Sequence, residues 1–267
     1  MSTALTATHH DPDGRLYAQT TRALPQLLAI FGRVAVQVTR ATVPRSVALL
    51  REAGVLLGAE PEGQPGGVAH LGWARRDALA LGLRLETPTV LLCDFDRALH
   101  WAERYPEELD AVAAALPTHD CTVLGRTQRA FASHPQVQSA TEAAVNQAFA
   151  AVCGRDWDIT AAARGLSRRA ATAILDGCPE TSIGTDAAWP LFLLRTGGFS
   201  LAYRATEGLE FETPDRYPAE VAAAGGLDAW LAAHDRSVDR WLERLEVARL
   251  EVEAMRLWEG ARSWQRL

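Results

Sequence analysis

The stretch that most constrains the fold is residues 87–101, TPTVLLCDFDRALHW. Four apolar residues follow Pro88 and Thr89, and the run ends abruptly in Asp94 and Asp96, one residue apart. A short apolar run with these boundaries is typical of a buried strand in a parallel sheet. Open α/β sheets bind ligands beyond the carboxyl ends of their strands. The sequence therefore predicts that the functional edge of the sheet lies at the two aspartates.

This Asp-x-Asp tripeptide has two interpretations. On the turn that leaves a strand, it can direct two hard oxygen ligands at one Mg²⁺ or Mn²⁺ ion, as a bound diphosphate requires. Alternatively, Asp94 caps the following helix and Asp96 faces water. The tripeptide alone does not separate the two, but the order of the surrounding elements favours a metal site formed by Asp94 and Asp96.

The composition excludes several classes of protein. The chain has 267 residues and a formal net charge of -6, whereas a nucleic-acid-binding protein would need a basic stripe. Its four cysteines lack C-x-x-C spacing, so we expect buried free thiols. No segment approaches the ~20 apolar residues that span a bilayer. We expect a cytoplasmic protein, and docking on a membrane surface stays open.

The first half of the chain alternates between strand and helix patterns. Residues 33–39 are predicted as the first core strand, 44–53 as a helix and 55–59 as the second strand, which together make a parallel crossover. Residues 60–70 are rich in glycine and proline and read as a loop, and 71–83 as a helix. The strand with the two aspartates follows, so the pattern predicts an α/β fold.

Further elements follow the aspartates. Residues 121–124 read as a strand, and Arg126 leaves it toward the face of the aspartates if the sheet is parallel there. Residues 156–163 are expected to cross as an extended segment, and Ser167 to begin a helix as its N-cap. The remaining predicted elements are a helix at 135–152, a helix starting at 185–186, a strand at 200–205 and an acidic loop at 207–217.

The chain is expected to divide into three parts. Residues 1–14 are polar and read as a disordered tail in which His9 and His10 are incidental. Residues 15–217 form the predicted ligand-binding domain, and 218–267 a helical extension. The extension contains Trp230, Trp241 and Trp258, with Trp264 close to its end, which indicates a packing stripe that covers the core or pairs with a second subunit as a homodimer.

The order of these marks resembles the GT-A fold nucleotide-sugar glycosyltransferases, in particular the dolichyl-phosphate mannose synthase-like and glucosyl-phosphoglycerate synthase-like enzymes. Four marks carry the resemblance over about residues 33–217: the strand 33–39 with its helix, GGVAHLGWARRDAL, LLCDFD, and WDITAAARGLSRRAA. The resemblance implies a GT-A (Rossmann-like) mixed, mostly parallel sheet flanked by helices. It also implies a sugar transfer from a nucleoside-diphosphate sugar to a small-molecule or lipid-phosphate acceptor.

The resemblance also implies roles for individual residues. Residues near the nucleotide and its diphosphate are Thr39, Arg40, Glu60, Gly72, Arg75, Arg76, Asp94 and, by its strand-end position, Arg126. Asp94 and Asp96 match the carboxylates that bind Mn²⁺ or Mg²⁺, and Asp186 the base that deprotonates the acceptor hydroxyl. Glu210 and Glu212 compete for the role of base, and a plain helix N-cap is the other interpretation of Asp186.

The sequence differs from the family's pattern at two places. After His134 only His234 follows, where many relatives have a late histidine that completes the metal shell, and the second strand ends in GAEPEG instead of an acidic Asp-Asp-Gly-Ser. His100, just after the aspartates, reads as a helix-face residue or an additional ligand. Two alternatives remain: a non-catalytic, nucleotide-sugar-binding member of the fold, and a nucleotidyltransferase, although QVTRATVP lacks the glycine-rich loop of that class.

Overall fold

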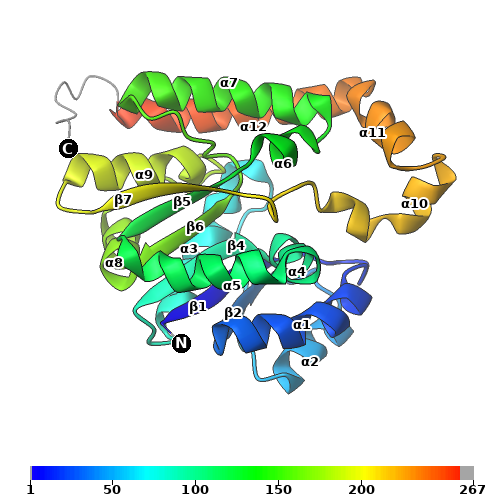
Figure 1. The fold of residues 1–267 in the computed structure, drawn as a ribbon, viewed down its shortest axis with the longest axis horizontal. Coiled ribbons are helices and arrows are strands. Elements are labelled where there is room, and N and C mark those ends of the chain that lie inside the picture. Colours follow the sequence, from blue (N-terminus) through cyan, green and yellow to red (C-terminus); the bar gives the residue numbers. More distant parts are fainter. Residues whose placement is uncertain (1, 259–267) are drawn as a thin grey trace.

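A seven-stranded mixed sheet forms the centre of the computed structural model, which describes residues 2–258 (Figure 1). The strand order is β3-β2-β1-β4-β6-β5-β7, and among these seven only β6 is antiparallel to its neighbours. The strands are β1 (Thr3–His9), β2 (Val34–Val38), β3 (Leu56–Ala59), β4 (Thr89–Asp94), β5 (Cys121–Arg126), β6 (Ala163–Ser167) and β7 (Leu201–Thr206). The carboxyl ends of the other six strands therefore share one edge of the sheet.

Helices cover both faces of the sheet (Figure 1). One face carries α1 (Tyr17–Phe31), α2 (Pro44–Glu52), α4 (Phe95–Arg104) and α5 (Pro106–Ala115). The other carries α3 (Leu71–Leu83), α7 (Gln136–Cys153), α8 (Arg168–Gly177), α9 (Thr185–Thr196) and α12 (Val238–Ala254). The remaining helices are α6 (Gln128–Ala132), α10 (Pro218–Ala223) and α11 (Leu227–Asp235). The predicted α/β fold with a mostly parallel sheet between helices is confirmed.

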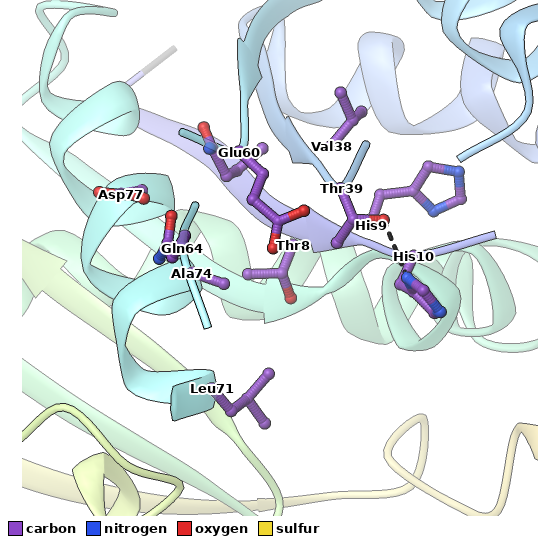
Figure 2. Close-up of a pocket in the computed structure, with 11 residues that line it drawn as sticks. Thr8, His9, His10, Val38, Thr39, Glu60, Gln64, Leu71, Ala74 and Asp77 are labelled. Atoms are coloured by element: carbon purple, nitrogen blue, oxygen red, sulfur yellow. Dashed lines mark hydrogen bonds between the residues drawn. The ribbon is translucent and has the colours of Figure 1, made fainter. Parts of the chain in front are cut away.

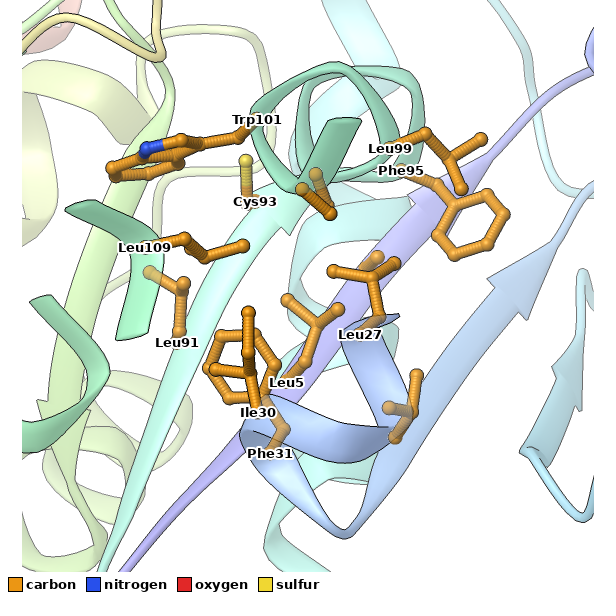
Figure 3. Packing of buried hydrophobic residues seen from close by; sticks show 14 of the residues in the cluster. Leu5, Leu27, Ile30, Phe31, Leu91, Cys93, Phe95, Leu99, Trp101 and Leu109 are labelled. Atoms are coloured by element: carbon orange, nitrogen blue, oxygen red, sulfur yellow. The ribbon is translucent and has the colours of Figure 1, made fainter. Parts of the chain in front are cut away.

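The two hydrophobic cores follow from the alternation of side chains along the strands. Leu91 and Cys93 of β4 point into the core beneath α1, α4 and α5, together with Leu5 of β1 (Figure 3). Val90 and Leu92 point to the opposite core, with α3 and α7. Because β4 is buried on both faces, its sequence is a continuous apolar run.

The N-terminal segment corrects the sequence-based expectation. The predicted disordered tail is wrong for residues 3–9, because β1 lies between β2 and β4 near the centre of the sheet. Composition misled here, since the strand is rich in threonine. The Thr3 hydroxyl donates to the Ala113 carbonyl at 2.7 Å and the Thr6 hydroxyl to the Ala78 carbonyl, so both buried hydroxyls are satisfied by helix backbones. The segment predicted as the first core strand is therefore the second.

Most other predicted elements match, with one addition. The segment expected to be merely extended at residues 156–163 ends in β6, which pairs antiparallel with both β4 and β5. Ser167 is the N-cap of α8, as predicted, and its hydroxyl accepts a hydrogen bond from the Ala170 amide. All four cysteines are buried free thiols, as expected.

The described part of the C-terminal extension contains α10, α11, α12 and a final 3-10 helix, Met255–Trp258, and α12 packs along α7 (Figure 1). Its outer face exposes Val238, Leu242 and Leu245, and pairing with a second subunit through this face stays a prediction. Residues 259–267, which include Trp264 and the end of the predicted extension, lie outside the described residues. Within residues 2–258, every helix is too short or too polar to cross a bilayer.

Candidate functional site

A hollow that is open to solvent lies where β1, β2 and β3 end, beside α3 (Figure 2), with about 400 Å³ of empty space when the solvent at its mouth is included. Its position follows from topology: the chain leaves β1 for β2 on one side and reaches β4 on the other, so the switch point of the sheet lies between β1 and β4, and the hollow lies beside it. Its walls combine polar strand ends with apolar helix residues. They are Thr8, His9, His10, Gln37, Val38, Thr39, Glu60, Gln64, Leu71, Ala74 and Asp77.

Two of the predicted nucleotide-contacting residues line this hollow, and a third supports it. Thr39 and Glu60 face the hollow from the ends of β2 and β3 (Figure 2). Arg40 lies outside and holds Glu60: its amide donates to Glu60 Oε2 at 3.2 Å and its Nε to the Glu60 carbonyl at 3.1 Å. His10, expected to be incidental, also lines the hollow, with Nδ1 2.8 Å from Thr39 Oγ1.

Asp94 and Asp96 lie beside the hollow at the end of β4. Asp94 accepts a hydrogen bond from Thr8 Oγ1 at 2.7 Å, so a hollow-lining side chain links the pocket to the aspartates. Asp94 occupies the N-cap position of α4, but its side chain makes no cap hydrogen bond, and the Asp96 side chain is 20% exposed and pairs with Arg216 instead of facing only water. Burial, Glu212 and Asp94 together raise the pKa of Asp96 to about 6.

Three guanidinium groups lie near Asp94, Asp96 and the neighbouring Glu212. Arg75, a predicted site residue, has Nη2 4.0 Å from Asp94. Arg216 has Nη1 3.2 Å from Asp96, and Arg97 has Nε 3.7 Å from Glu212. Sequence reasoning missed Arg216, because it lies 120 residues beyond Asp96 in a segment that reads only as an acidic loop. The pKa of Arg97 is raised because, although burial opposes its charge, Glu212 and Asp94 favour it.

Asp186, the predicted base, lies away from the hollow in a buried ion-pair centre. Its carboxylate is 2.9 Å from Arg75 and 2.7 Å from Arg164, and its side chain is 3% exposed. A carboxylate that is sealed and held by two guanidinium groups has no path to an acceptor hydroxyl. It orients Arg75, which in turn reaches Asp94. Its place in the first turn of α9 also suits the helix dipole.

Gly72 and Arg76 have structural positions. A side chain at Gly72 would collide with the backbone of Thr181 and Ser182, so glycine permits the close approach of α3 to that loop. Arg76 donates to the carbonyls of Leu175 and Cys178 at the carboxyl end of α8, at 2.5 and 2.7 Å. The structure thus brings neither residue to the hollow.

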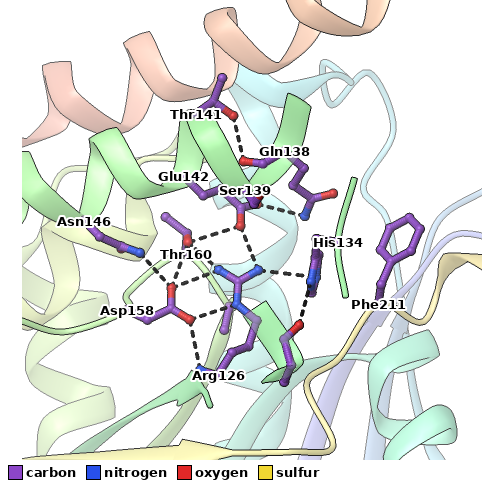
Figure 4. A network of polar contacts seen from close by, with 12 residues as sticks. Arg126, His134, Gln138, Ser139, Thr141, Glu142, Asn146, Asp158, Thr160 and Phe211 are labelled. Carbon is purple, nitrogen blue, oxygen red and sulfur yellow. Dashed lines mark hydrogen bonds and ion pairs between the residues drawn. The ribbon is translucent and has the colours of Figure 1, made fainter. Parts of the chain in front are cut away.

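Arg126 lies in a separate, sealed polar cluster between β5 and α7 (Figure 4). Its guanidinium is 2.7 Å from Glu142 Oε2 and forms two hydrogen bonds with Asp158, of 2.8 and 2.9 Å. The side chain is 0% exposed. Although burial alone would raise the pKa of Asp158, Arg126 holds it well below its usual range. The predicted contact of Arg126 with a nucleotide therefore has no geometric support.

The carboxylates at the end of β4 do not fit a divalent ion as they stand. Asp94 accepts from Thr8, while Asp96 accepts from Arg216 and from the Arg97 amide. Within residues 2–258, His, Cys, Asp and Glu form no group of three arranged to hold a metal. The Mn²⁺ or Mg²⁺ assignment to Asp94 and Asp96 remains a prediction.

The acidic segment 207–217 separates this site from a second hollow, which has about 970 Å³ of empty space when the open solvent is included. Phe211, Thr213 and Tyr217 face the second hollow, whereas Glu212 and Arg216 contact the groups around Asp96. The second hollow is also lined by Trp230 and Arg244. Among the described residues, the ion-pair partner of Arg244 is Glu142, 3.6 Å away.

His100 of α4 fastens the same segment. Its Nδ1 is 2.7 Å from Asp215 and its Nε2 is 3.2 Å from Glu210. Burial alone would lower the pKa of His100, but the hydrogen bonds to Asp215 and Glu210 raise it. This partly buried side chain therefore links α4 to the segment 207–217. Neither sequence-based interpretation of His100 predicted this link.

No protein-family model and no curated protein sequence matches this chain, so the arrangement of the strand ends and their side chains carries the functional argument.

Proposed function

We propose that the chain is a GT-A-type glycosyltransferase that binds a nucleoside-diphosphate sugar at the edge formed by β1, β2, β3 and β4. One observation carries the proposal: the hollow beside the sheet's switch point adjoins Asp94 and Asp96 through the hydrogen bond from Thr8. The hollow suits a nucleoside, because apolar Val38, Leu71 and Ala74 can contact a base while polar strand ends contact the ribose.

The diphosphate belongs beside the aspartates, where the guanidinium groups gather. Sugar transfer leaves negative charge on the departing phosphate, and fixed cations at that place stabilise it. Arg75 reaches Asp94 from α3, and Arg216 reaches Asp96 from the segment 207–217. An arginine presents a planar fork of donors that matches phosphate oxygens.

The acceptor belongs in the second hollow, across the segment 207–217. Among the carboxylates considered for the base, Glu212 suits the role better than Asp186, because it is paired with one guanidinium group instead of two and lies between Phe211 and Thr213, which line the second hollow. Its Oε2 has no hydrogen-bond partner among the described residues, and Arg97 is 3.7 Å away. We assign proton removal from the acceptor hydroxyl to Glu212.

Nucleotide binding can be tested by thermal denaturation with UDP, GDP, ADP, CDP and TDP. One of them should raise Tm, because a ligand bound only to the folded state stabilises it. Glu60→Gln should reduce the shift, whereas Glu62→Gln, whose side chain is 94% exposed, should leave it intact. If no nucleotide stabilises the protein under any metal condition, the proposal is wrong.

A non-catalytic nucleotide-sugar-binding protein is the second candidate, and the burial of Asp186 favours it. Hydrolysis of the donor sugar separates the two. Purified wild-type protein should release the sugar slowly, and Glu212→Gln should bind the nucleotide but transfer nothing. Binding without turnover in wild-type protein, with a full panel of donors and acceptors, would favour the non-catalytic candidate.

A further inference from the structure

Arg216 is the cation best placed to meet a diphosphate. It ends a short 3-10 helix, Thr213–Arg216, and its Nη2 donates to the His10 carbonyl at 2.8 Å. Its Nη1 donates to Asp96 Oδ2 at 3.2 Å. The guanidinium therefore joins a residue that lines the nucleotide hollow to a residue of the Asp-x-Asp pair. This is the junction where the diphosphate of a bound nucleotide would lie.

The guanidinium groups of Arg75 and Arg97 are already held by other contacts. Arg75 is 5% exposed and is held by Asp186 and the Thr185 hydroxyl. Arg97 is 11% exposed and donates to the Ala161 carbonyl. Arg216 is 21% exposed, and its buried Nε has no hydrogen-bond partner among the described residues. A guanidinium has five N–H donors, and these contacts use two of them.

Fixed cations already lie beside the carboxylates of this site, although Arg75 is closer to Asp186, at 2.9 Å, than to Asp94. Three carboxylates, those of Asp94, Asp96 and Glu212, face three guanidinium groups at 4.0, 3.2 and 3.7 Å. A divalent ion bound to Asp94 and Asp96 would have to displace or tolerate these fixed cations. Arg216 offers the positive charge and the hydrogen-bond donors that a diphosphate needs without such a displacement.

We propose that Arg216 takes the place of a divalent ion at this site, so that the chain binds a nucleoside diphosphate without metal. This inference rests on the proposed nucleotide binding. The guanidinium keeps its contact with Asp96 and directs its unused donors to the phosphate oxygens. Asp96 then positions Arg216 and does not ligate a metal.

The test is calorimetric titration of the best-binding nucleoside diphosphate in EDTA and, separately, in Mn²⁺. Wild-type protein should bind with dissociation constants that agree within about threefold in the two buffers. Arg216→Ala should weaken binding in EDTA by about tenfold or more, since it removes a charged hydrogen-bond donor. Arg216→Lys should retain part of the affinity. Arg249→Ala, which removes an exposed arginine paired with Glu246 and Glu253 of its own helix, is the matched control and should bind like wild type.

Each other outcome is decisive. Wild-type binding that disappears in EDTA and returns with Mn²⁺ overturns the metal-free inference but leaves nucleotide binding in place. Unchanged binding of Arg216→Ala in EDTA overturns the assignment to Arg216. Absence of binding in both buffers overturns the proposed function itself. If Arg216→Ala does not fold, Arg216→Gln, which keeps a donor for the His10 carbonyl, replaces it in the same titration.

Discussion

Two clusters of charged side chains near the carboxyl ends of strands show how differently similar residues are used. The cluster around Arg126 is sealed: its guanidinium meets Glu142 and Asp158 with short contacts, and its side chain is 0% exposed (Figure 4). The cluster around Asp94 and Asp96 adjoins a hollow, and the Nε donor of Arg216 finds no partner among residues 2–258. Residue types alone do not reveal function. An adjoining cavity, together with an unsatisfied donor, makes the open cluster the candidate site.

The sealed cluster should dominate stability. Arg126→Ala should lower the free energy of unfolding by about 3–5 kcal/mol, because Asp158 would remain buried without its guanidinium partner and Glu142 would keep only the longer contact with Arg244 among the described residues. Urea denaturation measures the loss. Arg216→Ala is the matched change in the open cluster and should cost about 1 kcal/mol or less, since its pair with Asp96 is partly exposed. Equal losses in the two variants would erase the distinction between the clusters.

Replacing one carboxylate by an amide in each cluster should change the stability of the protein in opposite directions. The pKa of Asp96 is raised to about 6, so its contribution to stability is fully present below pH 3.8 and is lost as pH rises through 6. Asp96→Asn should therefore stabilise the protein by about 1–2 kcal/mol at pH 8 and by less at pH 5. Asp158→Asn should destabilise at pH 8, because Arg126 favours the ionised Asp158 carboxylate. Tm measured at both pH values checks both signs; a destabilising Asp96→Asn would contradict the assignment.

The link that His100 forms between α4 and the segment 207–217 should have a smaller, local effect on stability. Because the pKa of His100 is raised, its contribution is fully present below pH 6.5 and is lost as pH rises through the folded-state value. His100→Gln should cost about 1 kcal/mol at pH 6 and less at pH 9. Amide hydrogen exchange should accelerate in residues 207–217 and stay unchanged around Arg126. Exchange that accelerates equally in both places would show that the segment is not held separately.

The smallest effect on stability is expected at the wall of the hollow. Thr39→Val removes the hydroxyl that is 2.8 Å from His10 Nδ1 and 3.2 Å from Thr42 Oγ1, both partly exposed contacts. Stability should change by only a few tenths of a kcal/mol, while the nucleotide-induced rise in Tm should shrink. Thr118→Val, at an exposed hydroxyl far from the hollow, is the control. An unchanged nucleotide shift in Thr39→Val would remove Thr39 from the site.

The sequence predicted the fold more successfully than the site, for physical reasons. Apolar runs and short connections indicated β2, β3 and β4, since burial on both faces demands such runs. β1 escaped prediction because its threonine hydroxyls are satisfied by helix carbonyls, which only the tertiary structure provides. Thr39, Glu60, Asp94 and Asp96 are close together because strand ends share an edge.

The remaining site residues depend on contacts between distant segments. Arg126 and Asp186 both look like ligand-binding residues in the sequence, yet partners far along the chain enclose them. Arg216 reaches Asp96 only because the segment 207–217 returns across the strand ends. Local patterns contain no information on such pairings, so charge and spacing cannot distinguish a sealed arginine from an open one.

The position of β1 has a practical consequence for anyone who trims this polypeptide. Removing its first nine residues would leave β2 and β4 facing each other across about 10 Å, twice the spacing of hydrogen-bonded neighbours. The sheet would divide into two unconnected halves, and Thr8 would be lost from beneath Asp94. A version shortened on the assumption that these residues are dispensable would thus lose both the central strand and part of the wall of the hollow.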